Sequence, residues 1–316
     1  MNWNPIAKCN DIIYTISDYA FRDGVYHGHL NIVKTLINNG VNINVFDDYA
    51  IQTSARNGDY EMTKFLVKNG ANIHANNDFP LRKSACHGYF KIVELLIENN
   101  ANIHAQDDEA FRLSIIYGHF NIVRFLIQKG TNIHAHNNSA LRITAEKGRF
   151  YTLKFLIDEG ADIHAENDEA LRESANNGHL DAVKILIEKG ANVRALNDQA
   201  LRLSACNGHF EVVKYLIEND ADLHAKNDEA LRKSVYNGHF NIVKYLIKND
   251  ANLNANANEV FKVCIKNEHF DIIQFLIKKT LWNLDHINIR IKLLFIKMNE
   301  PIHPIDDFIS EWLWKP

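Results

Sequence analysis

Apolar residues recur along the chain in two alternating patterns, each of which suits a short helix. In the stretch FEVVKYLIEN, four apolar residues fall on one broad helical stripe: Val212, Val213, Leu216 and Ile217. In the stretch before it, Leu201 and Ala205 lie four residues apart and mark the buried face of another helix. Both segments are shorter than the roughly 12–15 residues that an isolated helix needs. The pattern therefore predicts antiparallel helix pairs that are stabilised by their neighbours.

The helix pairs repeat with a constant period of thirty residues. Glycine marks the same point in eight of them: Gly28, Gly58, Gly88, Gly118, Gly148, Gly178, Gly208 and Gly238. A ninth unit is degenerate, because Glu268 replaces the glycine. Units that stack only on their neighbours form an elongated solenoid and not a globule with one pocket. The sequence thus predicts an all-α solenoid of about nine repeats with terminal caps.

Two turns per unit are predicted from the residues that tolerate a positive φ. The first turn carries the glycines just named, and the second follows the second helix. The second turn carries glycine or a residue type that tolerates left-handed backbone: Gly40, Gly70, Asn100, Gly130, Gly160, Gly190, Asp220 and Asp250. This restricted choice supports the assignment of a turn better than the glycines alone.

The repeat resembles the ankyrin repeat. The segment NGHFEVVKYLIENDADLHA is similar to the second half of an ankyrin unit, with its G-H, V-V-K-x-L-I and G-A-D-x-x-A pattern, and EALRLSA stands in place of T-P-L-H-x-A-A. The resemblance covers 17–286. The usual unit has about 33 residues, so it implies that the projecting β-hairpin finger is shortened to a tight loop. The short period is similar to that of the ankyrin proteins of giant amoeba-infecting DNA viruses (mimivirus-like).

Three segments follow from the repeat boundaries. We expect residues 1–16 to form an N-terminal capping segment and residues 17–286 to form the repeat array. Residues 287–316 break the period and are predicted to be a C-terminal helical cap or a docking tail. A cap is favoured because an open solenoid end exposes core residues.

Composition narrows the class of partner. A net charge of −4, with Lys and Arg spread among Asp and Glu, argues against a nucleic-acid surface. No apolar run approaches the ~18 residues of a membrane span, and the first residues lack a signal-peptide pattern. Four isolated cysteines fit a reducing compartment. We expect a monomer in the cytoplasm, which is the host cytoplasm if the protein is viral, with the nucleus as the alternative.

Clusters such as ANIHAQDDEAF invite a metal-site or acid–base interpretation. Equivalent residues of adjacent packed helices lie about 8–10 Å apart, whereas zinc needs nitrogen ligands at about 2.0–2.1 Å. The repeated Asp, as in Asp108, is predicted to cap its helix. The repeated His is expected to bond backbone of the next unit, and the repeated Arg to join repeats. We therefore predict no catalytic, cofactor-binding or metal-binding residue, and no enzyme.

Positions that differ from unit to unit are the candidates for recognition. The N-terminal repeats carry most of the aromatic residues there, and aromatics and Arg dominate binding hot spots. The predicted partner-binding residues are Tyr19, Tyr26, Tyr49, Arg56, Phe79, His87, Glu109 and Tyr117. The structural alternative is that Tyr19, Tyr49 and Phe79 cover the edge of the next repeat.

The resulting hypothesis is a non-catalytic scaffold that binds a protein partner on the concave face of the solenoid. Two alternatives stay open. The chain could be an adaptor that recruits a ubiquitin ligase through its C-terminal tail, or a structural component of a virus particle.

Overall fold

The computed structural model describes residues 5–252, 263–264 and 266–280. The chain divides into two compact units, residues 1–230 and residues 231–316. All the regular structure of the described residues is helical, which confirms the predicted all-α class. The predicted tail, 287–316, lies outside the described residues.

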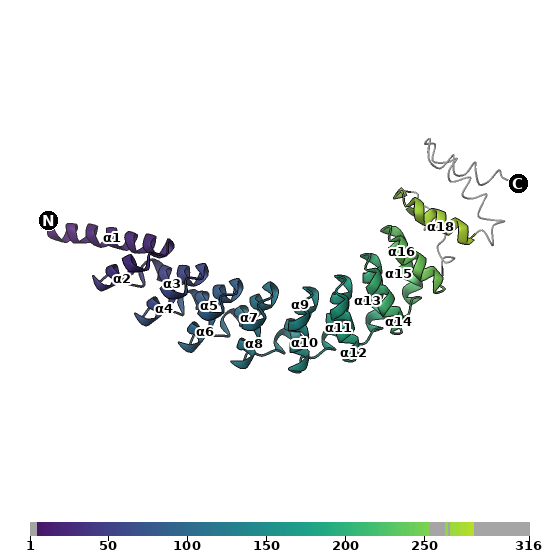
Figure 1. The fold of residues 1–316 in the computed structure, drawn as a ribbon, viewed down its shortest axis with the longest axis horizontal. Helices are drawn as coiled ribbons and strands as arrows, with labels where there is room; N and C mark the ends of the chain where they lie inside the picture. The colour runs from purple at the N-terminus through teal and green to yellow at the C-terminus, as the bar shows by residue number, and fades with distance from the viewer. Residues whose placement is uncertain (1–4, 253–262, 265, 281–316) are drawn as a thin grey trace, which may run out of the picture. The chain divides into compact units, whose positions relative to one another are not determined.

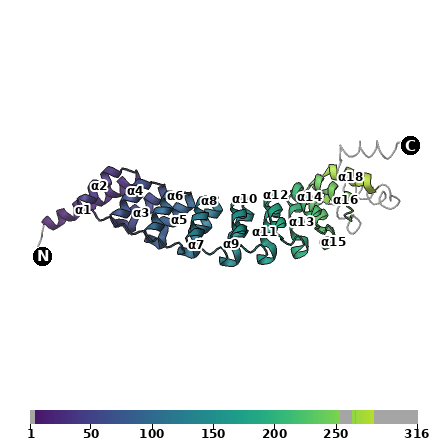
Figure 2. The ribbon, with the colours of Figure 1, turned by 60° about the horizontal axis from the view of Figure 1, so that its bottom comes forward.

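The first unit is a stack of helix pairs in two layers (Figures 1 and 2). The odd-numbered helices form one layer: α1 (Pro5–Tyr26), α3 (Val45–Asn57), α5 (Ala75–His87), α7 (Ala105–Tyr117), α9 (Ala135–Glu146), α11 (Ala165–Asn176) and α13 (Ala195–Cys206). The even-numbered helices form the other: α2 (Leu30–Asn38), α4 (Tyr60–Lys68), α6 (Phe90–Glu98), α8 (Phe120–Gln128), α10 (Phe150–Asp158), α12 (Leu180–Glu188) and α14 (Phe210–Glu218). The two helices of each pair pack on one another, and most helices also pack on the equivalent helix of the next repeat. Within this unit the odd-numbered helices line the concave side in Figure 1.

The second unit is also built from short helices that pack in pairs. Helix α15 (Ala225–Tyr236) spans the boundary at residue 230, and α16 (Phe240–Lys248) and α18 (Phe270–Thr280) follow. Ile242, Val243 and Leu246 are buried along α16. The Phe240 and Phe275 rings meet edge to face, 5.8 Å apart. These contacts join the degenerate ninth repeat to the eighth.

Burial follows the predicted helical stripes. Leu201 and Ala205 of α13 and Val212, Val213 and Leu216 of α14 are all 1% exposed or less. Ile217, at the edge of the stripe, is half-buried. Every repeat buries the same narrow stripe of apolar residues. The core is therefore a row of small apolar clusters, one for each repeat, between the two helix layers.

Both predicted turns have positive φ. The glycines of the first turn lie between +64° and +83°, and Glu268 takes +59° in the ninth repeat. In the second turn Asn100, Asp220 and Asp250 take φ of 72°, 68° and 68°. The substitution pattern had therefore identified left-handed backbone correctly.

A left-handed turn replaces the projecting hairpin. From α3 to α15, three consecutive residues at the start of each odd-numbered helix have φ between 49° and 58°. The second and third of these residues are always Asn or Asp, as in Asn77 and Asp78 or Asn167 and Asp168. Left-handed backbone costs most L-residues roughly 1–2 kcal/mol each, and Asn and Asp tolerate it best. The expected tight loop is confirmed, and its conformation explains the recurrent Asn-Asp pair.

The predicted N-terminal cap joins the first repeat without a break. Helix α1 runs continuously from Pro5 to Tyr26, across the boundary drawn at residue 16. Phe21 and Val25 of this helix are buried against Val33 of α2 and Ile51 of α3. The capping role of residues 1–16 stays a prediction.

Candidate partner-binding face

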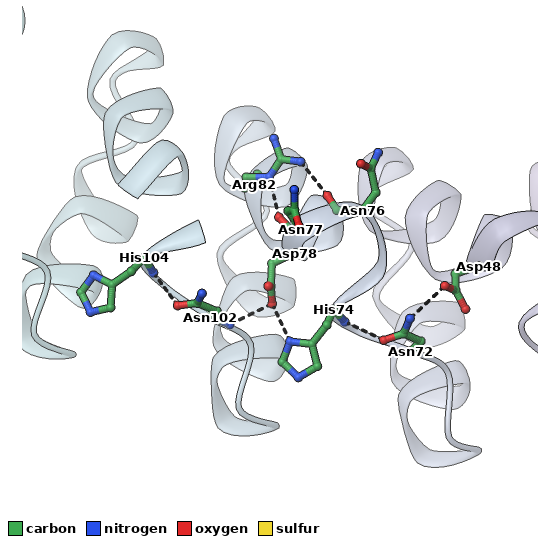
Figure 3. Close-up of polar contacts among 9 residues, drawn as sticks. All are labelled: Asp48, Asn72, His74, Asn76, Asn77, Asp78, Arg82, Asn102 and His104. Carbon is green, nitrogen blue, oxygen red and sulfur yellow. Dashed lines mark hydrogen bonds and ion pairs between the residues drawn. The ribbon is translucent and has the colours of Figure 1, made fainter. Parts of the chain in front are cut away.

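The cluster that suggested a metal site is a structural joint between repeats. Asp78 is 5% exposed, and its Oδ1 atom accepts hydrogen bonds from His74 Nδ1 at 3.0 Å and from the amide of Asn102 at 2.8 Å (Figure 3). Asn102 lies in the loop that leads into α7, the first helix of the next repeat. The prediction that this Asp caps its own helix was therefore wrong: the left-handed turn directs the carboxylate across the joint.

The same joint recurs along the first unit. Asp168 accepts from His164 and from the amide of Asn192, at 3.0 and 2.8 Å. In the repeat of Asp198, Arg194 replaces the histidine, and the carboxylate still accepts from the amide of Asp222. Burial raises the pKa of Asp198 above its ordinary value, while the Asp222 amide and the nearby guanidinium groups oppose that rise. These carboxylates accept hydrogen bonds from backbone amides of the following loop.

The loop histidines do not converge on one another. Each bonds the Asp or Asn of its own loop, and the four that bond an Asp have side chains that are 54% to 59% exposed. The described residues hold no group of three or more His, Cys, Asp or Glu side chains that could bind a metal ion. The repeated imidazole–carboxylate pair is thus a hydrogen-bonded link in each loop.

The histidine after the first turn reaches the preceding repeat. His119 Nε2 lies 2.9 Å from the carbonyl oxygen of Cys86, and His179 and His209 make the same contact one repeat back. The prediction of a bond to the next unit is therefore wrong in direction. Each ring also covers a glycine: a Cβ on Gly88 would lie 2.6 Å from His119. The first turn of each repeat, which carries the glycines at thirty-residue intervals from Gly28 to Gly238, is called the covered turn below.

The arginine column ties each left-handed turn to the next repeat. Arg82 donates from Nε to the carbonyl of Asn77 at 2.9 Å and from Nη2 to that of Asn76 at 2.8 Å. Its Nη1 atom pairs with Glu109, 27 residues on. Arg172 and Arg202 repeat this arrangement with Gln199 and Glu229. These contacts support the prediction that the column joins repeats. Each of these arginines bonds carbonyls of its own loop and a side chain of the next repeat, and none of these contacts is a pair within one helix.

One depression opens where this column is interrupted. It measures about 580 Å³ and is formed by α3 and α5. Its walls combine aromatic rings with charged and polar groups: Phe46, Asp47, Asp48, Tyr49, Gln52, Thr53, Arg56, Asn76 and Phe79. Three of the predicted partner-binding residues, Tyr49, Arg56 and Phe79, are thereby brought together.

Four predicted residues lie at the end of an odd-numbered helix and are exposed. These residues, called the end row, are Tyr26, Arg56, His87 and Tyr117. Tyr26 and Tyr117 are 56% and 55% exposed although both are aromatic. The ring contacts found for them are with a neighbouring histidine, His27 or His119. Side chains so exposed are free to contact a partner.

The other four, called the start row, have partners inside the stack: Tyr49, Phe79 and Glu109 lie near the beginnings of α3, α5 and α7, and Tyr19 holds the equivalent repeat position within the longer helix α1. Tyr19 packs on Phe46 with ring centroids 5.5 Å apart, and Arg22 lies 4.9 Å from the Tyr49 ring. Arg82 lies 5.8 Å from the ring of Phe79 and forms the ion pair with Glu109. These contacts support the alternative that the start row serves packing between repeats.

Sequence reasoning missed Phe46 and Asp47 as part of this face. Both belong to the left-handed turn of the second repeat, which the thirty-residue period had assigned to scaffold. The available signal was the column of seven arginines, in which Gln52 and Lys262 are the exceptions. The sequence shows that Gln52 is an exception, but only the structure shows the space that its shorter side chain leaves.

Comparisons with known proteins agree with this architecture. The family description "Ankyrin repeats (3 copies)" matches residues 21–107, 152–227 and 222–289. The crystal structure of the human ASB11 ankyrin repeat domain is similar, with a TM-score of 0.56 and 24% identity over 64% of this chain and 98% of that chain. No curated protein matches the sequence. No helix in the described residues is long and apolar enough to cross a membrane.

The matched ranges take in well over half of the chain. They include most of the helix pairs, turns of positive φ and joints described above. The chain belongs to the ankyrin repeat family.

Proposed function

We propose that the chain is a non-catalytic scaffold that binds a protein partner on the odd-numbered helices of its first four repeats. Ankyrin repeat domains typically act in protein–protein interaction. The observation that carries the proposal is the end row together with the adjoining depression. Tyr26, Arg56, His87 and Tyr117 are exposed at successive helix ends, and the joints between repeats use none of their side chains.

The composition of the end row suits a binding hot spot. Tyrosine and arginine are enriched at the centres of interfaces, where each can contribute 2 kcal/mol or more. The helices that carry them are fixed by buried residues such as Ile51, Leu81 and Ile115. A rigid surface loses little conformational entropy on binding, so more of the contact energy appears as affinity.

The start row has a supporting role in this proposal. Tyr19, Tyr49 and Phe79 keep part of their surface accessible beside the end row. Glu109 forms an ion pair with Arg82 of the arginine column. We expect the chain to act as a monomer in the cytoplasm. The thirty-residue period also supports the proposal of a viral source, which detection of the protein in virus-infected amoebae would test.

Simultaneous substitution of the end row tests the function. The variant with Tyr26→Ala, Arg56→Ala and Tyr117→Ala is compared with the wild type by proximity labelling and affinity capture in the native host cell. We expect recovery of the partner to fall by about tenfold or more, because two or three hot-spot side chains are removed. Unchanged recovery from a folded variant would contradict the proposal.

A matched control distinguishes this face from general surface effects. Tyr151 is 77% exposed on α10, and Arg124 is exposed on α8, both in the even-numbered layer. The variant with Tyr151→Ala and Arg124→Ala also removes a tyrosine and an arginine. It should recover the partner as well as the wild type does. An equal loss in both variants would place the binding face elsewhere.

A further inference from the structure

The depression lies at the one described interruption in the arginine column of the first unit. In four repeats a guanidinium donates to the carbonyls of the first two residues of the left-handed turn: Arg82, Arg112, Arg172 and Arg202. In the second repeat the column holds Gln52. Its Nε2 atom donates to the carbonyl of Asp47 at 2.5 Å, which corresponds to only one of those two bonds. The shorter side chain leaves the space that a guanidinium fills elsewhere.

The wall opposite the left-handed turn is suited to a stacked cation. For five arginines of the column, the group 27 residues later contacts the guanidinium, as Glu109 contacts Arg82 and Tyr49 contacts Arg22. Phe79 stands 27 residues after Gln52 and lines the depression. Phe79 thus occupies the place where a ring or an acid receives a guanidinium from the preceding repeat, and Gln52 supplies none. The cations that lie near the Phe79 ring are Arg82 and Lys83 of its own helix, at 5.8 and 5.4 Å. A cation over such a ring gains roughly 0.5–2 kcal/mol.

Charge favours a cation at one end of the depression. Asp47 is exposed, and the hydrogen bonds described for its repeat engage its carbonyl and not its carboxylate. Asp48 accepts from the Asn72 amide at 2.9 Å. Arg56 contributes the opposite charge, so an occupant that carries an acidic group beside its cation meets complementary groups at both places.

We propose that the depression between α3 and α5 binds an arginine side chain of the partner protein, in the manner of the chain's own arginines in the other repeats. This inference rests on the proposed function and names the chemistry that one part of the face recognises. A lysine ammonium is a point charge without the planar fork that donates to two adjacent acceptors and stacks on a ring. The site should therefore distinguish arginine from lysine.

A small probe isolates this recognition from the rest of the interface. N-acetyl-L-arginine amide is titrated into the full chain, and backbone amide shifts are followed by NMR. We expect shifts confined to residues 46–56 and 76–79, with a dissociation constant on the order of a millimolar for so small a ligand. The lysine and citrulline amides should bind at least about fivefold more weakly, because each lacks the fork or the charge.

Two variants test the geometry. Gln52→Arg places a guanidinium of the chain itself in the depression, so binding of the probe should fall about tenfold or more and the midpoint of urea unfolding should rise. Asp47→Asn should weaken the probe about threefold or more, since it removes the facing charge. The control Asp107→Asn changes the equivalent exposed carboxylate in a repeat whose site Arg112 already fills, and should change neither quantity.

Several results would overturn the inference. They are the absence of shifts at these amides when the probe is present at about ten times the expected dissociation constant, equal binding of citrulline amide, or undiminished binding to a folded Gln52→Arg variant. If these occur while the end-row variant still loses the partner, the proposed function stands and the arginine site does not. Conversely, loss of the partner with Gln52→Arg alone, and not with the end-row variant, supports the site and counts against the wider face.

Discussion

The two turns of each repeat have the same backbone conformation and opposite tolerance for side chains. The covered turn is glycine in all eight regular repeats, whereas the second turn, called the open turn here, is Asn or Asp in three. Gly88 and Gly70 illustrate the pair, with φ of 80° and 84°. A Cβ on Gly88 would lie 2.6 Å from the His119 ring, and a Cβ on Gly70 would have no neighbour within 4 Å.

The difference shows that a positive φ alone does not require glycine. Asn and Asp adopt left-handed backbone at modest cost, as Asn100 and Asp220 do in the open turn. At the covered turn a side chain from the next repeat lies against the glycine: the Tyr89 ring at Gly58, His179 at Gly148, and the Arg149 guanidinium at Gly118. Glycine persists where contact between repeats adds a steric requirement to the conformational one.

The largest effect is expected from placing the same side chain in both turns. Gly88→Asn should lower the free energy of unfolding by about 1–3 kcal/mol, because the new Cβ overlaps the His119 ring. Gly70→Asn should change it by less than about 0.5 kcal/mol, since the backbone is tolerated and the space is open. Urea unfolding of the full chain, followed by circular dichroism, measures both. Equal shifts would show that backbone conformation alone sets the requirement for glycine.

A smaller effect is expected from removing the covering ring. His119→Ala deletes the 2.9 Å hydrogen bond to the Cys86 carbonyl and should cost about 1 kcal/mol. In the background of His119→Ala, the Gly88→Asn substitution should cost less than it does alone, with a coupling energy of roughly 0.5–3 kcal/mol. The four proteins of this double-mutant cycle are compared by the same urea titration. Additive costs would mean that the ring and the glycine do not interact.

The sequence predicted the turns because they depend on local chemistry. Periodicity located both helices of each repeat, and the exchange of Gly for Asn or Asp located positive φ. The sequence could not predict that the Asn-Asp pair forms a left-handed turn. The same residues also suit a helix cap, which is the role predicted for the repeated Asp. What distinguishes the two is the hydrogen bond from Asn102 to Asp78, a contact between residues 24 positions apart that forms only when the helices between them have folded.

The candidate site was predictable in part for the same reason. Comparison between repeats identified Tyr26, Arg56 and Tyr117 as positions that the scaffold does not dictate, and all three are exposed. It could not separate them from Glu109, which varies equally but pairs with Arg82 across the joint. The depression depends on the length of Gln52 relative to arginine and on the ring of Phe79 27 residues later. Such a relation between two repeats is invisible while each position is compared only with its own column.

The smallest effect is expected from restoring glycine in the open turn. Asp220 has φ of 68° and its side chain takes part in none of the joints described above. Asp220→Gly removes the residual cost of left-handed backbone for an L-residue, but it also gives the unfolded chain more freedom. These contributions oppose each other, so the free energy of unfolding should change by less than about 0.5 kcal/mol. A loss above about 1 kcal/mol in the urea titration would indicate a contact of the Asp220 side chain that the folded stack needs. The side chain in the open turn would then contribute to stability through a contact, as the side chain that lies against the glycine does in the covered turn.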